Sequence, residues 1–243
     1  MSPRIWVRRV LPLALRQDLR QLWRTHLDDW HGLRFTREFG DIEHPEPLCV
    51  VQPIRRTSLY ENKLINLRRA AVLLDRQLIA AGADWSFWHA VRRPDACNGF
   101  VPGRNLVEGR LVEQNGGGLC QMASLLYHLA LLGGLTVRER HAHSVDIYRE
   151  EERFTPLGAD ATVVWGFRDL RLANPHAFPL VLRVRVGDGE LCGELHAQET
   201  LGARRVEFLR ETREPAQVHV RTLIDGVQAG VTDYRRLSAE GRG

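Results

Sequence analysis

A triple-glycine turn followed at once by an apolar helix is the feature that most constrains how this chain can fold. Gly116-Gly117-Gly118 precedes Cys120, and a helical apolar pattern runs from Cys120 to Leu132, where Gly133-Gly134 ends it. The apolar residues cover nearly the whole circumference: Met122, Leu125, Leu126, Leu129 and Leu132 on one side, and Tyr127 and Leu131 beside Cys120 and Ser124 on the other. Such a helix must be covered by two layers. The pattern predicts a central helix with a cysteine in its first turn.

That position favours a reactive thiol. The first turn of a helix has unpaired N–H groups and a partial positive charge, which stabilise a thiolate and can also hold an oxyanion. Thiol catalysis further needs a histidine within hydrogen-bond reach and a group that orients it. His143 on the next predicted strand and Asp160 at the edge of the following one supply both. We therefore expect Cys120 to attack a carbonyl, His143 to accept and return the proton, and Asp160 to orient the imidazole.

Three further residues are candidates for the oxyanion and substrate site. Gln114 precedes Cys120 by six residues, the interval at which papain-like proteases carry the glutamine of their oxyanion hole. Gly118 lies at the start of the helix, and His141 is two residues from His143 on the same side of the predicted strand.

Other interpretations of these residues remain open. Cys120 can be a small buried side chain, and His141 and His143 can be polar anchors in a cleft or bind a metal together with Cys120. A fourth metal ligand at a recognisable spacing is missing, so no metal and no cofactor is expected. Asp146 and Asp169 compete with Asp160 for the orienting role.

The remaining pattern predicts an α+β fold. A basic helix is expected over residues 4–31, an extended connector marked by prolines 45, 47 and 53, and a second helix over 62–81. Residues 85–88 and 99–109 are expected to form strand and loop. Period-two patterns predict strands over 135–147, 161–165, 169–173, 180–186 and 190–197, the last two joined by Gly187-Asp188-Gly189, and short strands over 206–209 and 218–224. The expected organisation is an N-terminal segment (1–54), a main domain (55–198) and a small β appendage (199–243).

Composition narrows the function classes. The chain has 243 residues, 44% of them hydrophobic, and a net charge of only +4 with scattered arginines, so nucleic-acid binding is not expected. The four cysteines are widely separated, which argues against a disulfide framework, and three of them are expected to be buried small residues. The apolar run near the N-terminus is short and broken by Pro12, so the expected location is the cytoplasm. The basic helix either packs on the domain or lies on a membrane surface.

The order of cysteine, histidine and aspartate on helix, strand and strand resembles the papain and transglutaminase group, which implies a central helix against an antiparallel sheet. The detailed motifs resemble the VanW family over about residues 55–186. These motifs are Gly116 to Gln121, Leu126-Tyr127, Glu139 to Ser144, Gly158 to Val163, Asp169-Leu170, Asn174, and upstream Asn62-Lys63, Asn66-Leu67 and Trp85 to Trp88.

The family is named for an accessory protein of vancomycin B-type resistance, and the chain resembles its short form without a membrane span. The resemblance implies a link to cell-wall peptides or glycopeptide resistance, with a peptide or amide such as a peptidoglycan precursor as substrate. Two functions follow as expectations: a thiol-dependent amide or peptide hydrolase or acyltransferase, or a non-catalytic protein that recognises a cell-wall peptide or a partner enzyme.

Overall fold

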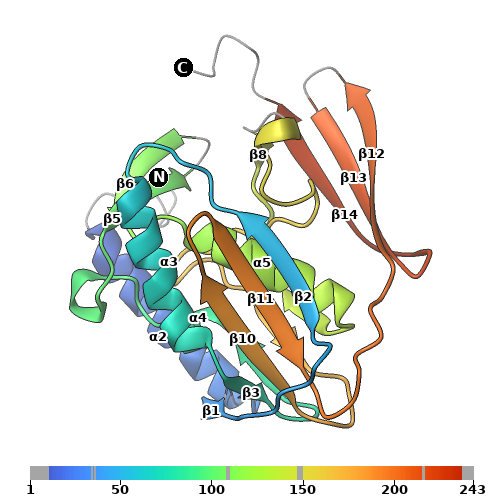
Figure 1. Ribbon diagram of the computed structural model, residues 1–243. Helices are drawn as coiled ribbons and strands as arrows, with labels where there is room; N and C mark the ends of the chain where they lie inside the picture. The colour runs from blue at the N-terminus through green and yellow to red at the C-terminus, as the bar shows by residue number, and fades with distance from the viewer. Residues whose placement is uncertain are drawn as a thin grey trace.

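The computed structural model describes residues 11–33, 35, 37–107, 110–146, 150–214 and 217–236. It is a mixed α+β structure in which sheets predominate over helices. Figure 1 shows helix α5 lying behind a sheet in the strand order β1-β3-β10-β11-β2. All neighbouring strands of this sheet are antiparallel. The strands are β1 (Glu38–Phe39), β2 (Leu48–Pro53), β3 (Gln77–Ile79), β10 (Leu180–Val186) and β11 (Glu190–His196).

The central helix confirms the prediction from the glycine turn. Helix α5 (Leu119–Leu132) is buried on nearly every side, with Met122 and Leu125 fully enclosed in the main core. It packs against β11 and β2 on one side and β7 on the other, and helix α3 (Tyr60–Leu74) also contacts it. A small antiparallel sheet, β4-β9-β7, makes the second layer. Its strands are β4 (Asp84–Ser86), β9 (Arg171–Ala173) and β7 (Thr136–Glu139).

Several elements differ from the sequence predictions. The helix expected over 62–81 ends at Leu74. The next two residues bond to β10 instead: Asp75 accepts a hydrogen bond from Val184 N–H, and Arg76 N–H donates to the Leu182 carbonyl. These bonds place the following residues beside β10, where they form β3. The expected connector contains β2, an edge strand of the central sheet. The expected loop at 99–109 lies largely in a hairpin of β5 (Pro102–Val107) and β6 (Arg110–Asn115).

A short helix was also missed. Helix α4 (Phe87–Val91) follows β4 directly, and the Ser86 hydroxyl caps it by accepting from His89 N–H at 3.1 Å. Serine before an apolar run is an N-cap signal, and it identifies this helix in retrospect. The 3₁₀ turns Ala96–Asn98 and Glu150–Glu152 lie in connecting segments.

The strand expected over 135–147 is interrupted. β7 ends at Glu139 and β8 (Val145–Asp146) resumes the extended chain in another sheet, because Arg140 turns away to bond the carbonyls of Gly158 and Asp160. The strand expected over 161–165 is also wrong, since the described segment forms only an isolated bridge between Val164 and Arg168.

The C-terminal strands form a separate sheet at the upper right of Figure 1, in the order β12-β13-β14-β8. β14 pairs with β8 in parallel, so the last described strand is joined to the segment that follows the central helix. The appendage is larger than predicted because each strand is longer and a third was missed. Its strands are β12 (Val206–Glu214), β13 (Gln217–Ile224) and β14 (Val227–Arg236).

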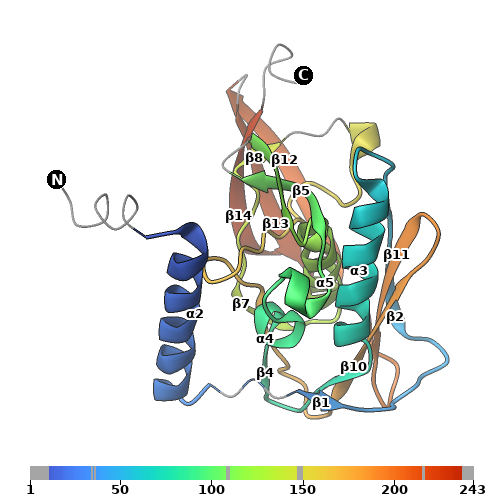
Figure 2. The ribbon, with the colours of Figure 1, turned by 90° about the vertical axis from the view of Figure 1, so that its left-hand side faces the viewer.

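Helix α2 (Leu13–Trp30) stands along one edge of the molecule in Figure 2. It confirms the described part of the basic helix expected over 4–31, whereas residues 4–10 lie outside the described residues. None of the side chains of α2, all of which the structure describes, is buried. None of the described helices has the length and apolar character needed to cross a membrane.

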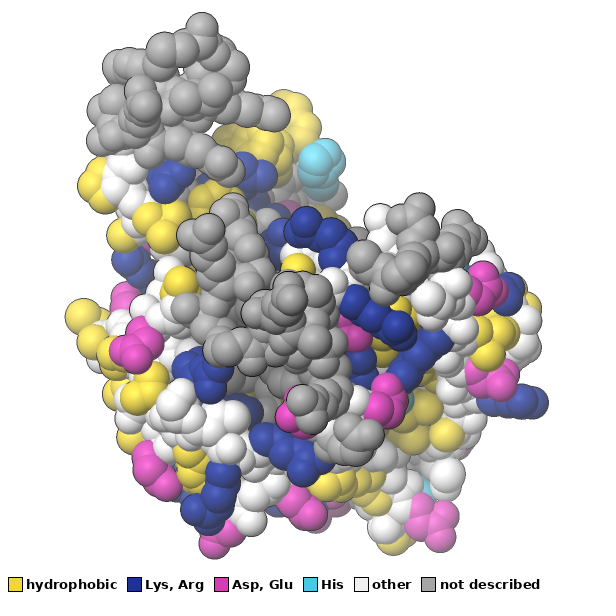
Figure 3. All heavy atoms as spheres, turned by 90° about the horizontal axis from the view of Figure 1, so that it is seen from above, with side chains coloured by type: hydrophobic (Ala, Val, Ile, Leu, Met, Phe, Trp, Pro, Cys, Tyr) yellow, Lys and Arg dark blue, Asp and Glu magenta, His cyan; other side chains and the backbone are white. Residues whose placement is uncertain are grey.

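The expectation that three cysteines are buried small residues is wrong. Cys49 and Cys97 are exposed and Cys192 is half-buried. The scattered charge agrees with the described surface: from above, basic side chains are interspersed with acidic and apolar ones (Figure 3).

Candidate active site

The glycine turn sets Cys120 in place through backbone geometry. Gly116 and Gly118 have φ values of 83° and 101°, in the left-handed region that side chains disfavour, and Gly118 is the N-cap of α5. Gly117 lies so close to Gly103 of β5 that a Cβ there would overlap its backbone. Helix α5 therefore begins at Leu119, one residue before the start that the sequence predicts, and Cys120 lies in its first turn, as predicted.

Cys120 opens onto a cavity of about 270 Å³. The cavity is enclosed by the ends of β6 and α5, the segment 162–165, helix α4, the loop after it, and the start of α2. Gln114 and Thr162 contribute polar groups, and Trp88 and Trp165, whose rings lie edge to face at 5.7 Å, contribute apolar surface. The cavity thus combines a sulfur, hydrogen-bonding groups and aromatic walls, which is the usual composition of a small-molecule or peptide site.

His143 links Cys120 to Asp160. Its Nδ1 lies 2.8 Å from Asp160 Oδ2, which also accepts the His143 backbone N–H at 2.8 Å, and its imidazole lies near enough to Cys120 for the thiol to raise the His143 pKa. Because an ionised carboxylate only accepts hydrogen bonds, Nδ1 carries the proton and Nε2 is left for the sulfur. The structure therefore places the three predicted residues next to one another, in the order Cys120, His143, Asp160.

The electrostatics favour charged forms of this histidine and aspartate. Burial lowers the pKa of His143, but hydrogen bonds to Asp160 and Cys120 and the charges of both outweigh it and raise the pKa to about 10. Burial would raise the pKa of Asp160, yet the hydrogen bond and charge of His143 and the charge of Arg140 hold that pKa well below its ordinary value. The imidazole is therefore a cation at neutral pH and the carboxylate an anion.

Asp160 is held by two residues that sequence analysis missed. Tyr234 of β14 donates its hydroxyl to Asp160 Oδ1, and Arg140 Nη2 lies 3.0 Å from the same oxygen. Burial and the charge of Asp160 raise the pKa of Tyr234, so its hydroxyl keeps its proton. The Arg140 guanidinium also stacks over the Tyr127 ring, 4.8 Å from its centre. No local pattern signals a contact across 74 residues.

Comparison with known proteins places this architecture in a family. The family model described as VanW like protein matches residues 62–196. The chain belongs to the VanW family. It is 34% identical over 139 residues to the vancomycin B-type resistance protein VanW of Enterococcus faecalis, an alignment that covers 57% of this chain and 50% of that protein. It is also 27% identical over 139 residues to a Bacillus subtilis protein named uncharacterized protein YoaR, and that alignment covers 57% of this chain and 44% of that protein. The chain therefore spans about half the length of these relatives, and no solved structure matches it.

The VanW-like region contains all six predicted site residues, and the structure brings most of them together. Gln114 lines the cavity beside Cys120, and Gly118 is the helix cap below it. His141 is turned elsewhere: its Nε2 lies 2.9 Å from Glu139 Oε1, and only its backbone carbonyl reaches the site, accepting Thr162 N–H at 2.7 Å.

The two rival carboxylates have other partners. Asp169 binds the Ser86 hydroxyl at 2.6 Å and the Trp88 N–H, and Asp146 binds Arg153. The metal site considered for Cys120, His141 and His143 is not favoured, because His141 faces Glu139. Within the described part of the chain, the ligand atoms that converge belong to Cys49, Cys192 and Glu194, where the two sulfurs lie 3.6 Å apart on the outer face of the central sheet.

Thr162 is a cavity residue that the spacing arguments did not single out. It is 3% exposed, yet its Oγ1 finds no hydrogen-bond partner among the described residues, although it belongs to the cavity wall. A buried hydroxyl without a partner lowers stability and is an available contact for a ligand.

We therefore expect Thr162→Val to leave the free energy of unfolding unchanged or to raise it by about 1 kcal/mol, since no hydrogen bond is lost. Urea unfolding measures this. The matched control is Ser124→Ala, which removes a hydroxyl that accepts Ala161 N–H at 2.9 Å and donates to the Cys120 carbonyl at 2.7 Å. That control should lower the free energy of unfolding by about 1–3 kcal/mol. A loss at Thr162 as large as that at Ser124 would show that the Thr162 hydroxyl is structural.

Proposed function

We propose that this VanW-family protein is a thiol-dependent amide or peptide hydrolase or acyltransferase that uses Cys120, His143 and Asp160. The observation that carries the proposal is the grouping of these three side chains: the His143 imidazole is hydrogen-bonded to Asp160 and lies next to Cys120, and the cysteine is at a helix N-terminus on a cavity wall. A papain- or transglutaminase-like core is part of the same proposal, supported by the central helix between two sheet layers.

The proposed reaction follows from the charges. The Cys120 sulfur attacks the substrate carbonyl carbon as a thiolate and forms an S–C bond, while the backbone N–H groups at the start of α5 and Gln114 stabilise the oxyanion. Collapse of the intermediate breaks the C–N bond, and His143 gives its proton to the departing amine. Water or a second amine then attacks the thioester and releases Cys120, with the proton returning to His143.

The substrate class is a proposal drawn from the relative's name alone. Because the Enterococcus faecalis relative is named for vancomycin B-type resistance, we infer a cell-wall peptide, such as a peptidoglycan precursor. The cavity's hydrogen-bonding and aromatic walls suit an extended peptide.

A second function has its own supporting observation. The Cys120 sulfur lies 3.8 Å from the Val163 carbonyl and is placed to donate to it, which is the behaviour of a neutral thiol. In addition, Asp160 organises Arg140 and Tyr234 as well as His143. The Cys120–Val163 contact and the several partners of Asp160 both fit a protein that binds a cell-wall peptide or a partner enzyme without catalysing a reaction.

The pH dependence of Cys120 alkylation distinguishes the two functions. Iodoacetamide alkylates the thiolate form of a cysteine, and a neighbouring imidazolium favours that form over the neutral thiol. We expect iodoacetamide to alkylate Cys120 rapidly at about pH 6.5, and His143→Gln to slow this by about tenfold to a hundredfold. Peptide mapping separates Cys120 from the exposed Cys97, whose rate serves as the internal control. Equal rates at Cys120 and Cys97, unchanged by His143→Gln, would favour the binding function.

A further inference from the structure

Helix α2 presents an apolar stripe to solvent. Leu15, Leu19, Leu22, Trp23 and Trp30 are between 43% and 80% exposed. At 3.6 residues per turn these five side chains fall within a sector of about 100° on one side of the helix. An exposed apolar patch of this kind marks an interaction surface in a folded protein.

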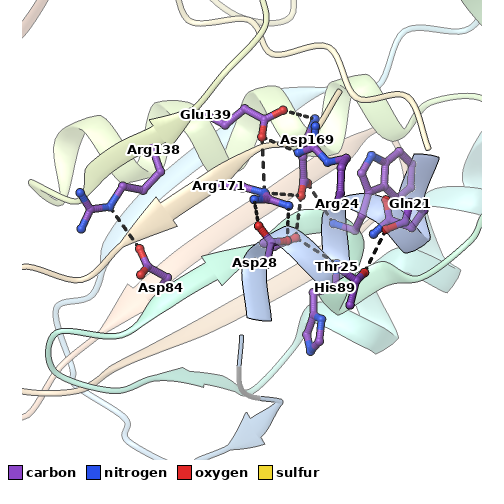
Figure 4. A network of polar contacts seen from close by, with 12 residues as sticks. Gln21, Arg24, Thr25, Asp28, Asp84, His89, Arg138, Glu139, Asp169 and Arg171 are labelled. Atoms are coloured by element: carbon purple, nitrogen blue, oxygen red, sulfur yellow. Dashed lines mark hydrogen bonds and ion pairs between the residues drawn. The ribbon is translucent and has the colours of Figure 1, made fainter. Parts of the chain in front are cut away.

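The opposite side of α2 holds the helix on the domain through charges (Figure 4). Arg24 Nη2 lies 2.5 Å from Glu139, and Arg171 binds both oxygens of Asp28 at 2.7 and 2.8 Å. Nearer the cavity, Asp18 accepts from Arg93 at 2.6 Å. The amphipathic helix is therefore inverted relative to an ordinary surface helix, with its polar face inward and its apolar face outward.

These ion pairs also affect the net charge on the exposed side of α2, because they neutralise acidic side chains of the helix. The acidic side chains of residues 18 and 28 are neutralised by arginines of the domain, and the exposed Asp29 lies at the far end of the helix. Arg20 is exposed beside the stripe, with its guanidinium over the Phe167 ring. The sequence up to Arg16 contains four arginines and no acidic residue. Among the described residues, the outward side of α2 thus carries apolar and basic side chains, with the acidic Asp29 at its C-terminal end.

We propose that α2, with its own arginines Arg16 and Arg20, binds the surface of an anionic lipid bilayer. Leucine and tryptophan side chains on one face, with arginines beside them, are the composition of helices that lie in the headgroup region. Anionic headgroups complement the arginines. A second copy of this chain packed in parallel through α2 is a poorer partner, because that pairing would bring the same arginines of both copies together. The inference does not depend on Cys120 chemistry.

Co-sedimentation of the full chain with vesicles tests this inference. The probes are vesicles of phosphatidylcholine alone and of phosphatidylcholine with about one-third phosphatidylglycerol. We expect binding to the anionic vesicles that weakens as salt rises. Leu19→Glu combined with Leu22→Glu should weaken that binding at least tenfold, since both apolar contacts are lost and two negative charges are added.

The matched control is Val72→Glu, which alters a 69% exposed apolar residue on α3 outside the stripe. It should bind vesicles like the unmodified chain, and circular dichroism checks that every variant folds. Two results would overturn the proposal: no binding to anionic vesicles at low salt, or equal binding by the double variant. A dimer in sedimentation equilibrium that the double variant abolishes, without vesicle binding, would assign the stripe to a second copy instead.

Discussion

Replacing Asp160 by alanine should lower the free energy of unfolding by about 3–5 kcal/mol, the cost of leaving a buried charge without its partner. The carboxylate is 7% exposed overall and neutralises two cations, Arg140 and the His143 imidazolium, and Tyr234 donates to it. Its removal leaves the buried Arg140 guanidinium without its counter-ion, the His143 imidazole without the carboxylate that keeps it charged, and the Tyr234 hydroxyl without an acceptor. Urea unfolding at neutral pH measures the change.

Asp233→Ala is the matched control, because Asp233 also bonds a histidine, His219, but its side chain is 71% exposed. Exposed ion pairs contribute about 0–1 kcal/mol, so this variant should unfold almost like the unmodified chain. Equal effects of the two substitutions would contradict the role given to Asp160 at the junction of the central helix and the C-terminal sheet.

The same charges fix the sign of the pH dependence. His143, whose pKa is raised to about 10, contributes stability that is complete below its ordinary pKa of about 6.5 and is lost as pH rises through the folded value. Asp160, whose pKa is lowered, contributes stability that is present above its ordinary value and is lost in acid. Asp160→Ala removes both contributions. Its loss of unfolding free energy should therefore be largest between about pH 4 and pH 6.5, where both contributions are complete in the unmodified chain.

The parts of the fold that sequence predicts are those governed by local pattern. The sequence predicts helix α5 because a segment between glycines that is apolar on every side of a helix is stable only when it is buried. Strands β10 and β11 were predicted because alternation on both sides of Gly187-Asp188-Gly189 specifies a hairpin. Cys120, His143 and Asp160 are singled out by the sequence because their chemistry and order are visible along the chain, and the structure brings the three side chains near one another.

The parts that sequence does not predict depend on contacts with distant residues. The end of α3 is set by bonds from Asp75 and Arg76 to β10, and propensity alone continues the helix. Tyr234 reaches Asp160 because β14 pairs with β8, and Arg140 reaches it from the residue after β7. The stripe of α2 has the same spacing whether it faces a core or solvent, so periodicity shows that a face exists and not which way it points.

The largest catalytic effect is expected at Cys120. With p-nitrophenyl acetate, a small activated ester, the sulfur should form an S–C bond to the acetyl carbon as the C–O bond to p-nitrophenolate breaks. Formation of the thioester is faster than its hydrolysis in such reactions, so a burst of p-nitrophenolate should precede slower turnover. Cys120→Ala removes the nucleophile and should abolish the burst, a loss of at least about a thousandfold in its rate. Cys97→Ala, which removes an exposed thiol elsewhere, should leave the burst intact.

Mass spectrometry of the protein quenched during that burst tests the central claim most directly. The account predicts one acetyl group per chain, mapped to the peptide that contains Cys120, with a much lower yield in His143→Gln. Unacetylated Cys120 throughout turnover, or release of p-nitrophenolate that is the same in Cys120→Ala, would contradict it.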